Sequence, residues 1–313
     1  MTGGKLFESA LKRCLLNEIN KTGKNPKALV GGDAGKCCET LTSVASVTGN
    51  EAGVAALSVY RAVNSLAAAG AKAEGITLSL SIPKDFGEDR IRDFVRELIG
   101  ACEKADVRIL DGNAVVTENE SLTSVVTAIG KDCAALVPLD ENRDKVILMI
   151  GNTGTAGAAM IAGSHREALM TRLPEGFVDK AAAMFDDALC AEKALRLSKD
   201  LGGRVIMHDV EDGGLFGAVW ELCERENIGC ELEIGCIPIK QATVEVSEFF
   251  DINPYILRGD GAMLVIAEDT PEARAAGHMI GRVIPGKERV VVLGSERRFL
   301  EPNRNDDYFN LRG

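Results

Sequence analysis

The stretch over residues 205–222 constrains the fold of this chain more than any other part of the sequence. It consists of an apolar strand (205–207), a polar strand end (His208 and Asp209), a glycine pair (Gly213 and Gly214) and an amphipathic helix (215–222). Glycines permit close approach to the backbone, and the start of a helix favours negative charge. This turn is therefore suited to bind an anion such as phosphate.

His208 and Asp209 have two interpretations. In the functional one they are catalytic residues that orient a substrate or a phosphate at a cleft. In the other one the segment is an ordinary strand–turn–helix connection, His208 is a structural histidine and Asp209 accepts a hydrogen bond in the turn. His165 and His278 are expected on helices without a partner motif, and we interpret both as structural.

Length and composition indicate a globular protein of two domains. The chain has 313 residues, of which 46% are hydrophobic and 27% charged. Its formal net charge of −11 argues against nucleic-acid binding, which requires a basic surface. The first residues do not resemble a signal peptide, and no apolar run reaches the roughly 18 residues that span a bilayer. We therefore expect a cytoplasmic protein without membrane contact.

Nine cysteines are scattered along the chain. Their odd number, without a secretion signal, argues against a disulfide framework, and their spacing does not match a zinc site. Several are expected in the core as reduced thiols. The adjacent pair Cys37-Cys38 lies next to a glycine turn and is either a reactive site or a structural one.

The first half of the chain mixes helices and strands. Apolar periodicity predicts helices over 6–19, 52–70 and 89–105, strands over 41–47, 76–82, 107–110 and 123–129, and a turn at Asp111-Gly112-Asn113. The polar stretch 131–143 is the best linker candidate. We therefore predict an N-terminal domain over 1–140 and a C-terminal domain over 141–313.

The second half predicts a further α/β or α+β unit. We expect strands over 146–150, 205–207, 263–267 and 290–293, a long helix over 177–199, and a helix from Pro271 to about Arg282. Glycine-centred turns are expected after strands at 31–35, 151–157 and 211–214. The turn at 151–157 has neither a P-loop lysine nor the G-x-G-x-x-G spacing, which disfavours P-loop ATPases and Rossmann dehydrogenases.

Taken in order, these segments resemble the aminoimidazole ribonucleotide (AIR) synthetase superfamily, nearest its hydrogenase maturation branch. Residues 208–215 resemble its histidine–aspartate–glycine–glycine signature, and residues 62–72 resemble its VNDLAxMGAxP helix. Residues 146–157 resemble the strand and GxxGxxG turn that open its second domain, and 237–239 resemble the IPV segment of the maturation branch. The resemblance extends from about Gly31 to Leu293.

The resemblance implies a two-domain α/β fold. The N-terminal domain would pair across a homodimer into a β-barrel, and the C-terminal domain would form an α+β sandwich. ATP would bind near the dimer interface, with Mg²⁺ on its phosphates, and would phosphorylate an oxygen of a small amide or carbonyl substrate. A maturation protein is an implied partner. Implied ATP-binding positions are Asp33 (also the metal ligand), Asn64, Ser65, Gly112, Asn113, Gly151, Gly154, Gly213 and Gly214.

The sequence departs from the family pattern at the metal site. Ser65 stands where the family helix has an aspartate, and Asn113 stands where the family turn has an acid, although Asp111 would take that place after a small register change. Each change removes a negative charge that would hold Mg²⁺. The alternative to an enzyme is therefore a non-catalytic nucleotide-binding or scaffold relative.

Two subfamily features also differ. The maturation dehydratase ends in a cysteine that accepts the carbamoyl group, whereas this sequence ends at Gly313, so we expect that chemistry to be absent in its usual form. Cys37-Cys38 is similar in position to the reactive cysteine of selenophosphate synthetases, but the flanking residues differ.

Overall fold

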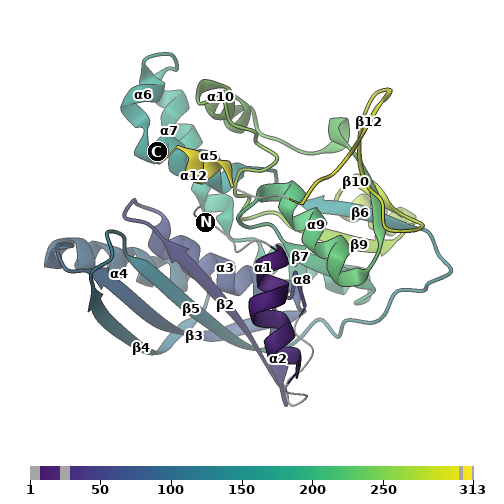
Figure 1. Cartoon of the computed structure of the whole chain (residues 1–313), viewed down its shortest axis with the longest axis horizontal. Helices are drawn as coiled ribbons and strands as arrows, with labels where there is room; N and C mark the ends of the chain where they lie inside the picture. The colour runs from purple at the N-terminus through teal and green to yellow at the C-terminus, as the bar shows by residue number, and fades with distance from the viewer. Residues whose placement is uncertain (1–7, 22–28, 303–305, 312–313) are drawn as a thin grey trace.

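The computed structural model describes residues 8–21, 29–302 and 306–311. Two β-sheets with flanking helices make up most of it (Figure 1). The predicted mixed α/β class with two sheet-based halves is confirmed. A chain segment without regular structure, residues 133–144, connects the sheets, and the domain boundary at 140 stays a prediction.

The N-terminal sheet has the strand order β1-β2-β5-β3-β4. All neighbours are antiparallel except β3 and β4, which are parallel. Its strands are β1 (Gly35–Cys37), β2 (Thr40–Thr48), β3 (Ala71–Pro83), β4 (Arg108–Thr117) and β5 (Thr123–Asp132). Alternate residues of β2 and β5 are buried under α3 (Val54–Ala68), while α4 (Glu88–Lys104) packs against α3. Within the described part of the chain, the other face of the sheet carries exposed residues of β2 and β4.

Helix α3 is the element that both halves share. All its residues are buried, because it contacts β2 and β5 on one side and β7 and α8 of the other half on the other. Arg61, Asn64 and Ser65 lie three and four positions apart, so they share one face of this helix. Their hydrogen-bond partners all belong to the C-terminal half.

The C-terminal sheet has the strand order β12-β11-β8-β10-β6-β9-β7. Its central strands β6 and β9 read as continuous apolar runs because both of their faces are buried. Ile147 and Leu264 pack with α9 on one face, whereas Val146 and Val265 pack with α8 on the other. The strands are β6 (Lys145–Ile150), β7 (Val205–Asp209), β8 (Gly229–Glu233), β9 (Met263–Glu268), β10 (His278–Ile284), β11 (Arg289–Leu293) and β12 (Glu296–Phe299).

The helices of this half flank the sheet and its loops (Figure 1). They are α5 (Thr155–Ser164), α6 (Arg166–Met170), α7 (Glu175–Ala183), α8 (Ala191–Asp200), α9 (Gly214–Glu226), α10 (Gln241–Phe249), α11 (Pro271–Ala276) and α12 (Asp307–Asn310), with 3-10 turns η2 (Met184–Ala188) and η3 (Ile234–Cys236). Ahead of the first sheet lie α1 (Glu8–Leu11), the π-helical turn η1 (Lys12–Leu16) and α2 (Asn17–Lys21). The start of the helix predicted over 6–19 lies outside the described residues.

Three predicted elements are wrong. The turn at 111–113 is the middle of β4, where the Asp111 and Asn113 side chains accept from the N–H groups of Gly112 and Ala114. The helix over 177–199 is interrupted after Ala188. The helix expected to reach Arg282 ends at Ala276, because residues 278–284 pair with β6 and β8 as strand β10. His278 is therefore on a strand, and His165 lies between α5 and α6.

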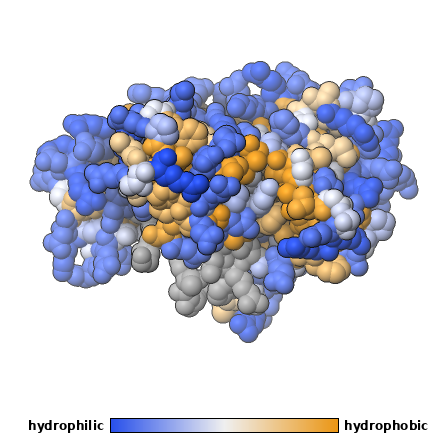
Figure 2. Space-filling view, turned by 90° about the horizontal axis from the view of Figure 1, so that it is seen from above, coloured by the Kyte–Doolittle hydropathy of each residue, from blue (hydrophilic) through white to orange (hydrophobic). Residues whose placement is uncertain are grey.

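The face of the molecule drawn in Figure 2 is mostly hydrophilic. In the face that Figure 2 shows, apolar residues gather toward the middle of the molecule, with hydrophilic residues at both ends. All nine cysteines are free, and Cys102, Cys190, Cys223 and Cys230 are buried as expected for reduced core thiols, whereas Cys37 and Cys38 are exposed. Among the helices described, none has the length and apolar character needed to cross a membrane.

Candidate functional site

The strand–turn–helix predicted over 205–222 is present. β7 ends in His208 and Asp209, and α9 begins after Gly213, whose φ is +91°. Gly214 follows with a φ of +61°, and a Cβ there would lie 2.6 Å from the carbonyl oxygen of Leu257. A glycine is required at this position because the backbone of residues 255–257 packs directly on it.

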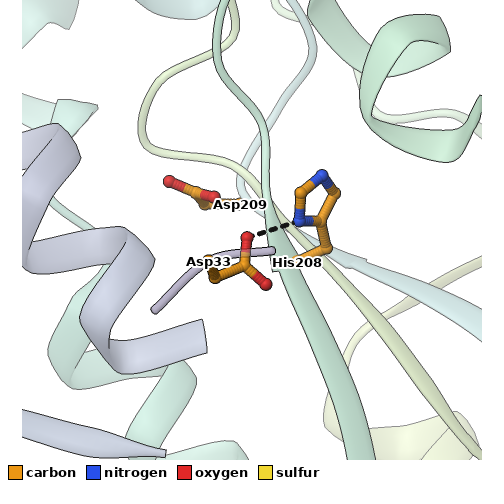
Figure 3. A group of neighbouring side chains, drawn as sticks. All are labelled: Asp33, His208 and Asp209. Carbon is orange, nitrogen blue, oxygen red and sulfur yellow. Dashed lines mark hydrogen bonds and ion pairs between the residues drawn. The ribbon is translucent and has the colours of Figure 1, made fainter. Parts of the chain in front are cut away.

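Asp33 and His208 form a buried ion pair at the end of β7. The Asp33 carboxylate lies 2.5 Å from His208 Nδ1, and both side chains are 5% exposed. Figure 3 shows the Asp33 carboxylate facing the His208 ring, with Asp209 beside them. The other ring nitrogen, Nε2, lies 3.2 Å from Glu221 of α9. The imidazole is therefore held at both nitrogens by carboxylates.

Arg225 of α9 completes this arrangement. Its guanidinium binds the second oxygen of Asp33 and also donates to the carbonyl oxygens of Gly31 at 2.9 Å and Met207 at 2.8 Å. Glu221 and Arg225 are four positions apart, so one face of α9 serves both His208 and Asp33. Asp33 thus has a cationic side chain on each carboxylate oxygen.

The charges of this group determine its titration. Burial alone would lower the pKa of His208, but the charge of Asp33 and the hydrogen bonds to Asp33 and Glu221 outweigh it and raise this pKa to about 10. Burial would raise the pKa of Asp33, and the positive charges of His208 and Arg225 lower it instead. At neutral pH the pair is therefore imidazolium and carboxylate.

Asp209 has the opposite electrostatic environment. Its carboxylate accepts a hydrogen bond from Ser65 at 2.7 Å, and the same hydroxyl lies 3.2 Å from Glu211. Burial, then the charges of Glu211 and Asp33, raise the pKa of Asp209 well above its usual range. The carboxylates of Asp209 and Glu211 thus meet at the Ser65 hydroxyl.

The ligand atoms gathered here are of a kind that can hold a cation. Asp33, His208 and Asp209 each offer one ligand atom, and these atoms lie within 4.8 Å of one another. Mg²⁺ prefers oxygen ligands. Asp209 offers such an oxygen, whereas Asp33 would have to exchange one of its cationic partners for a metal.

Asn64 is engaged elsewhere. Its amide nitrogen donates to Ala188 at 2.9 Å, and its amide oxygen accepts from the N–H groups of Cys190 and Ala191 at 2.9 and 3.1 Å. The side chain thereby satisfies the backbone at the interruption between η2 and α8. This contact explains why the predicted long helix is divided.

The remaining predicted glycines and Asn113 are distributed over two places. Gly151 and Gly154 follow β6 and pack against the loop before β9, where Cβ atoms would meet Gly261 O at 2.5 Å and Pro254 O at 2.8 Å. Gly112 and Asn113 lie on β4, the outermost strand of the other sheet (Figure 1), and line an open cavity of about 400 Å³ with Leu78 and Ile109. The structure thus brings together Asp33, Ser65, His208 and Asp209, with Gly213 and Gly214 in the adjoining turn.

A buried ion network next to this turn was not predicted from the sequence. Arg61 of α3 donates to Asp260 and to Asp212, each at 2.6 Å, and Arg258 lies 3.1 Å from Asp212. Arg61, Arg258 and Asp260 are at most 3% exposed. The only local signal was the sequence Arg258-Gly259-Asp260-Gly261, a charged loop immediately before an apolar strand.

Comparison with known proteins identifies the family. The family model described as "AIR synthase related protein, N-terminal domain" matches residues 26–131. The chain is 26% identical to the carbamoyl dehydratase HypE of Bradyrhizobium diazoefficiens over 244 residues, which are 73% of this chain. Both matches support the AIR synthase-related superfamily. The match spans 66% of that relative's length, just under two thirds.

Solved structures of this superfamily share the fold. HypE in a HypE–HypF complex superposes with a TM-score of 0.74 at 19% identity, over 92% of this chain and 99% of that one. The hydrogenase maturation protein HypE in complex with ATP gives a TM-score of 0.69 at 17% identity, over 98% of this chain and 97% of that one. The superfamily and the HypE-like branch predicted from the sequence are confirmed.

Proposed function

We propose that this protein binds ATP with Mg²⁺ beside the Asp33–His208 pair and phosphorylates an oxygen of a small amide or carbonyl substrate, as a HypE-like hydrogenase maturation factor. The observation that carries the proposal is the group of carboxylates, Asp209 and Glu211 with Asp33 nearby, around the Ser65 hydroxyl. This group adjoins a glycine turn and a helix start. The fold shared with an ATP complex of HypE supports the choice of nucleotide.

In this proposal each side chain has a defined role. Asp209 and Glu211 would hold Mg²⁺, with Asp33 as a further ligand. Bound Mg²⁺ would neutralise charge on the phosphates during transfer. His208 is a positioning residue, because its ring nitrogens hold Asp33 and Glu221 and thereby fix the carboxylates around the metal. Gly213 and Gly214 form the turn that leads into the start of α9, where negative charge is favoured.

The second candidate is a non-catalytic nucleotide-binding or scaffold protein. Two observations favour it: both oxygens of Asp33 are bound to the cationic side chains of His208 and Arg225, and a serine stands at the family's aspartate position. If Asp33 keeps both partners, the proposed metal site loses one of its three carboxylate ligands.

Calorimetry with ATP separates the two candidates. ATP is titrated with and without Mg²⁺ into the wild type, into Asp209→Asn, and into the control Asp93→Asn, whose carboxylate is on the exposed face of α4. The enzyme proposal predicts Mg²⁺-dependent binding that Asp209→Asn abolishes and Asp93→Asn retains. If the wild type binds ATP with the same affinity in the presence and absence of Mg²⁺, this result supports the non-catalytic candidate and contradicts the enzyme proposal.

The open face of the N-terminal sheet suggests a homodimer. Val44 of β2 and Val116 of β4 are 67% and 72% exposed, and Ile109, Leu110 and Val115 are also exposed. Apolar exposure of this kind is typical of an interface. Size-exclusion chromatography with light scattering should give twice the chain mass, and a monomer would refute the pairing. The fold shared with HypE in its HypF complex makes a maturation protein the second proposed partner.

A further inference from the structure

Arg61 is a buried cation that joins the two halves of the molecule. It belongs to α3 of the N-terminal half and is 3% exposed. Its guanidinium donates from Nε and Nη2 to the two oxygens of Asp260, at 2.6 and 3.1 Å, and Nη2 also donates to Asp212 at 2.6 Å. Asp260 lies in the loop before β9, and Asp212 lies in the turn before α9. Because the guanidinium is a rigid planar fork, it fixes the orientation of both carboxylates relative to α3.

The acidic turn after β7 is bonded to α3 at both of its ends. Arg61 bonds Asp212 at one end, and Ser65, four positions further along the same face of α3, bonds Asp209 at 2.7 Å at the other. Glu211 lies between these two points, with its carboxylate 3.2 Å from the Ser65 hydroxyl. The position of Glu211 therefore depends on both side chains of α3.

The two loops that Arg61 holds also contact each other. The N–H group of Val210 donates to the carbonyl oxygen of Ala262 at 3.1 Å, and the N–H group of Gly259 donates to that of Glu211 at 3.4 Å. A shift of the loop before β9 would therefore move the turn that carries Glu211.

The charges around Arg61 keep it protonated. Burial alone would lower the pKa of Arg61, but the charges of Asp212, Asp260 and Glu211 raise it well above its usual range. A buried ion pair of this kind adds little net stability, because removing its charges from water costs about as much as their attraction returns. The contact of Arg61 with two loops next to the candidate site therefore points to a role in orientation.

We propose that Arg61 is a positioning residue of the proposed metal–nucleotide site, and that it holds the turn after β7 so that the carboxylates of Asp209 and Glu211 meet at Ser65. Arg61 acts through these carboxylates, because a guanidinium has no acceptor atom with which to bind a metal. This inference deepens the proposed ATP function and rests on it for the identity of the ligand.

The variant that tests the proposal is Arg61→Lys. Lysine retains the positive charge, but its single ammonium cannot reproduce the two-pronged bond to Asp260 together with the bond to Asp212. The matched control is Arg92→Lys, because Arg92 also bonds two carboxylates but lies on the exposed face of α4. Calorimetry measures the affinity of each form for ATP with and without Mg²⁺.

We expect Arg61→Lys to lower the affinity for ATP with Mg²⁺ about tenfold or more, the size of a hydrogen bond between charged groups. Its affinity for ATP without Mg²⁺ should equal that of the wild type, and Arg92→Lys should equal the wild type in both titrations. Unchanged affinity of Arg61→Lys for ATP with Mg²⁺ overturns the inference. An equal loss with and without Mg²⁺ also overturns it, because general damage to the fold then explains the result.

Hydrogen exchange of the unliganded protein provides a readout that does not depend on ATP. In Arg61→Lys, exchange should accelerate at Val210, Gly214 and Gly259, whose N–H groups bond within and between the two loops. Exchange in β10 and β11, on the far side of the C-terminal sheet from β7, should stay as in the wild type. Unchanged exchange in the loops, or the same acceleration in β10 and β11, contradicts a positioning role.

A second variant, Asp260→Asn, applies if Arg61→Lys does not fold. It retains the shape of the side chain and the bond of Arg61 to Asp212, and it weakens only the two-pronged bond. It should change ATP affinity and loop exchange in the same directions, and wild-type values in both measurements overturn the inference.

The two proposals fail differently. If Arg61→Lys accelerates exchange in the loops but the wild type does not bind ATP with Mg²⁺, Arg61 positions the turn and the ATP function falls. If the wild type and Arg61→Lys bind ATP with Mg²⁺ equally well, the ATP function stands and the inference falls.

Discussion

Replacing Asp33 by asparagine should destabilise the fold mainly through His208 and Arg225. The variant retains the volume of the side chain but leaves two buried cations without their shared anion. Removing one partner of a buried ion pair costs about 3–5 kcal/mol. The rise of the His208 pKa from 6.5 to about 10 corresponds to about 5 kcal/mol of interaction, which agrees in size. Because asparagine still accepts a hydrogen bond, we expect a loss of about 3 kcal/mol.

The same variant should change how stability depends on pH. His208 has a raised pKa in the folded state, so its contribution is fully present below pH 6.5 and is lost as pH rises toward about 10. Wild-type stability should therefore fall between pH 6.5 and 10. In Asp33→Asn this slope should largely disappear, because burial then opposes protonation of His208. The Asp33 contribution has the opposite sign: its pKa is lowered, so it is lost only as pH falls below the ordinary range of aspartate.

Urea unfolding at several pH values measures both effects. Asp93→Asn serves as the control and should stay within about 0.5 kcal/mol of the wild type. The chain has three histidines, so NMR signals of His208 can be assigned with His208→Gln and titrated directly. A His208 that titrates near pH 6.5 in the wild type, or equal pH slopes in wild type and Asp33→Asn, would refute the reasoning.

Three further predictions address the surroundings of the site. Gly214→Ala should lower the unfolding free energy by about 2 kcal/mol or more, because the new Cβ would meet Leu257 O at 2.6 Å in a left-handed backbone. An unfolding free energy equal to that of the wild type would show that the loop around Leu257 moves to make room for the methyl group. Asn64→Ala should cost about 1–3 kcal/mol and accelerate hydrogen exchange at residues 188–191, since three backbone groups lose their partner; unchanged exchange there would contradict the assigned role. Burial, then the charge of Asp212, raises the pKa of Asp306 to about 6, so its contribution to holding the C-terminal segment is full below pH 3.8 and lost as pH rises through 6. Exchange protection of residues 306–311, corrected for intrinsic rates, should accordingly decrease from pH 5 to pH 7, and constant protection would speak against this pKa.

Elements with strong local patterns were predictable from the sequence. The strand, glycine pair and helix over 205–222, the apolar helix α3 and the alternating strand β2 agree with the structure, because each pattern reflects burial along its own element. Strand β10 was missed, since its pairing with β6 and β8 involves residues that are far away in the sequence. The Asp-Gly-Asn sequence at 111–113 favours a turn, but β4 is an edge strand and its side chains satisfy the local backbone.

The site was predictable only in part. Asp33, Ser65, His208 and Asp209 were singled out, and they do lie together, but their roles in ATP and metal binding stay predictions. Arg225 was not identified, because the sequence around it is typical of an exposed helix face. Its partner Asp33 is almost 200 positions away in the sequence, so only the folded structure shows the contact. Arg61 was missed for the same reason, since Asp260 and Asp212 come from distant loops.

The most direct test of the central proposal locates the metal–nucleotide complex relative to His208. Mn²⁺ replaces Mg²⁺ on oxygen ligands and broadens nearby NMR signals. Addition of Mn²⁺ with ATP should broaden the His208 signals before those of His165 and His278, and ATP should be required for the effect. Unbroadened His208 signals at saturating Mn²⁺ and ATP would contradict a metal–nucleotide site beside Asp33 and His208.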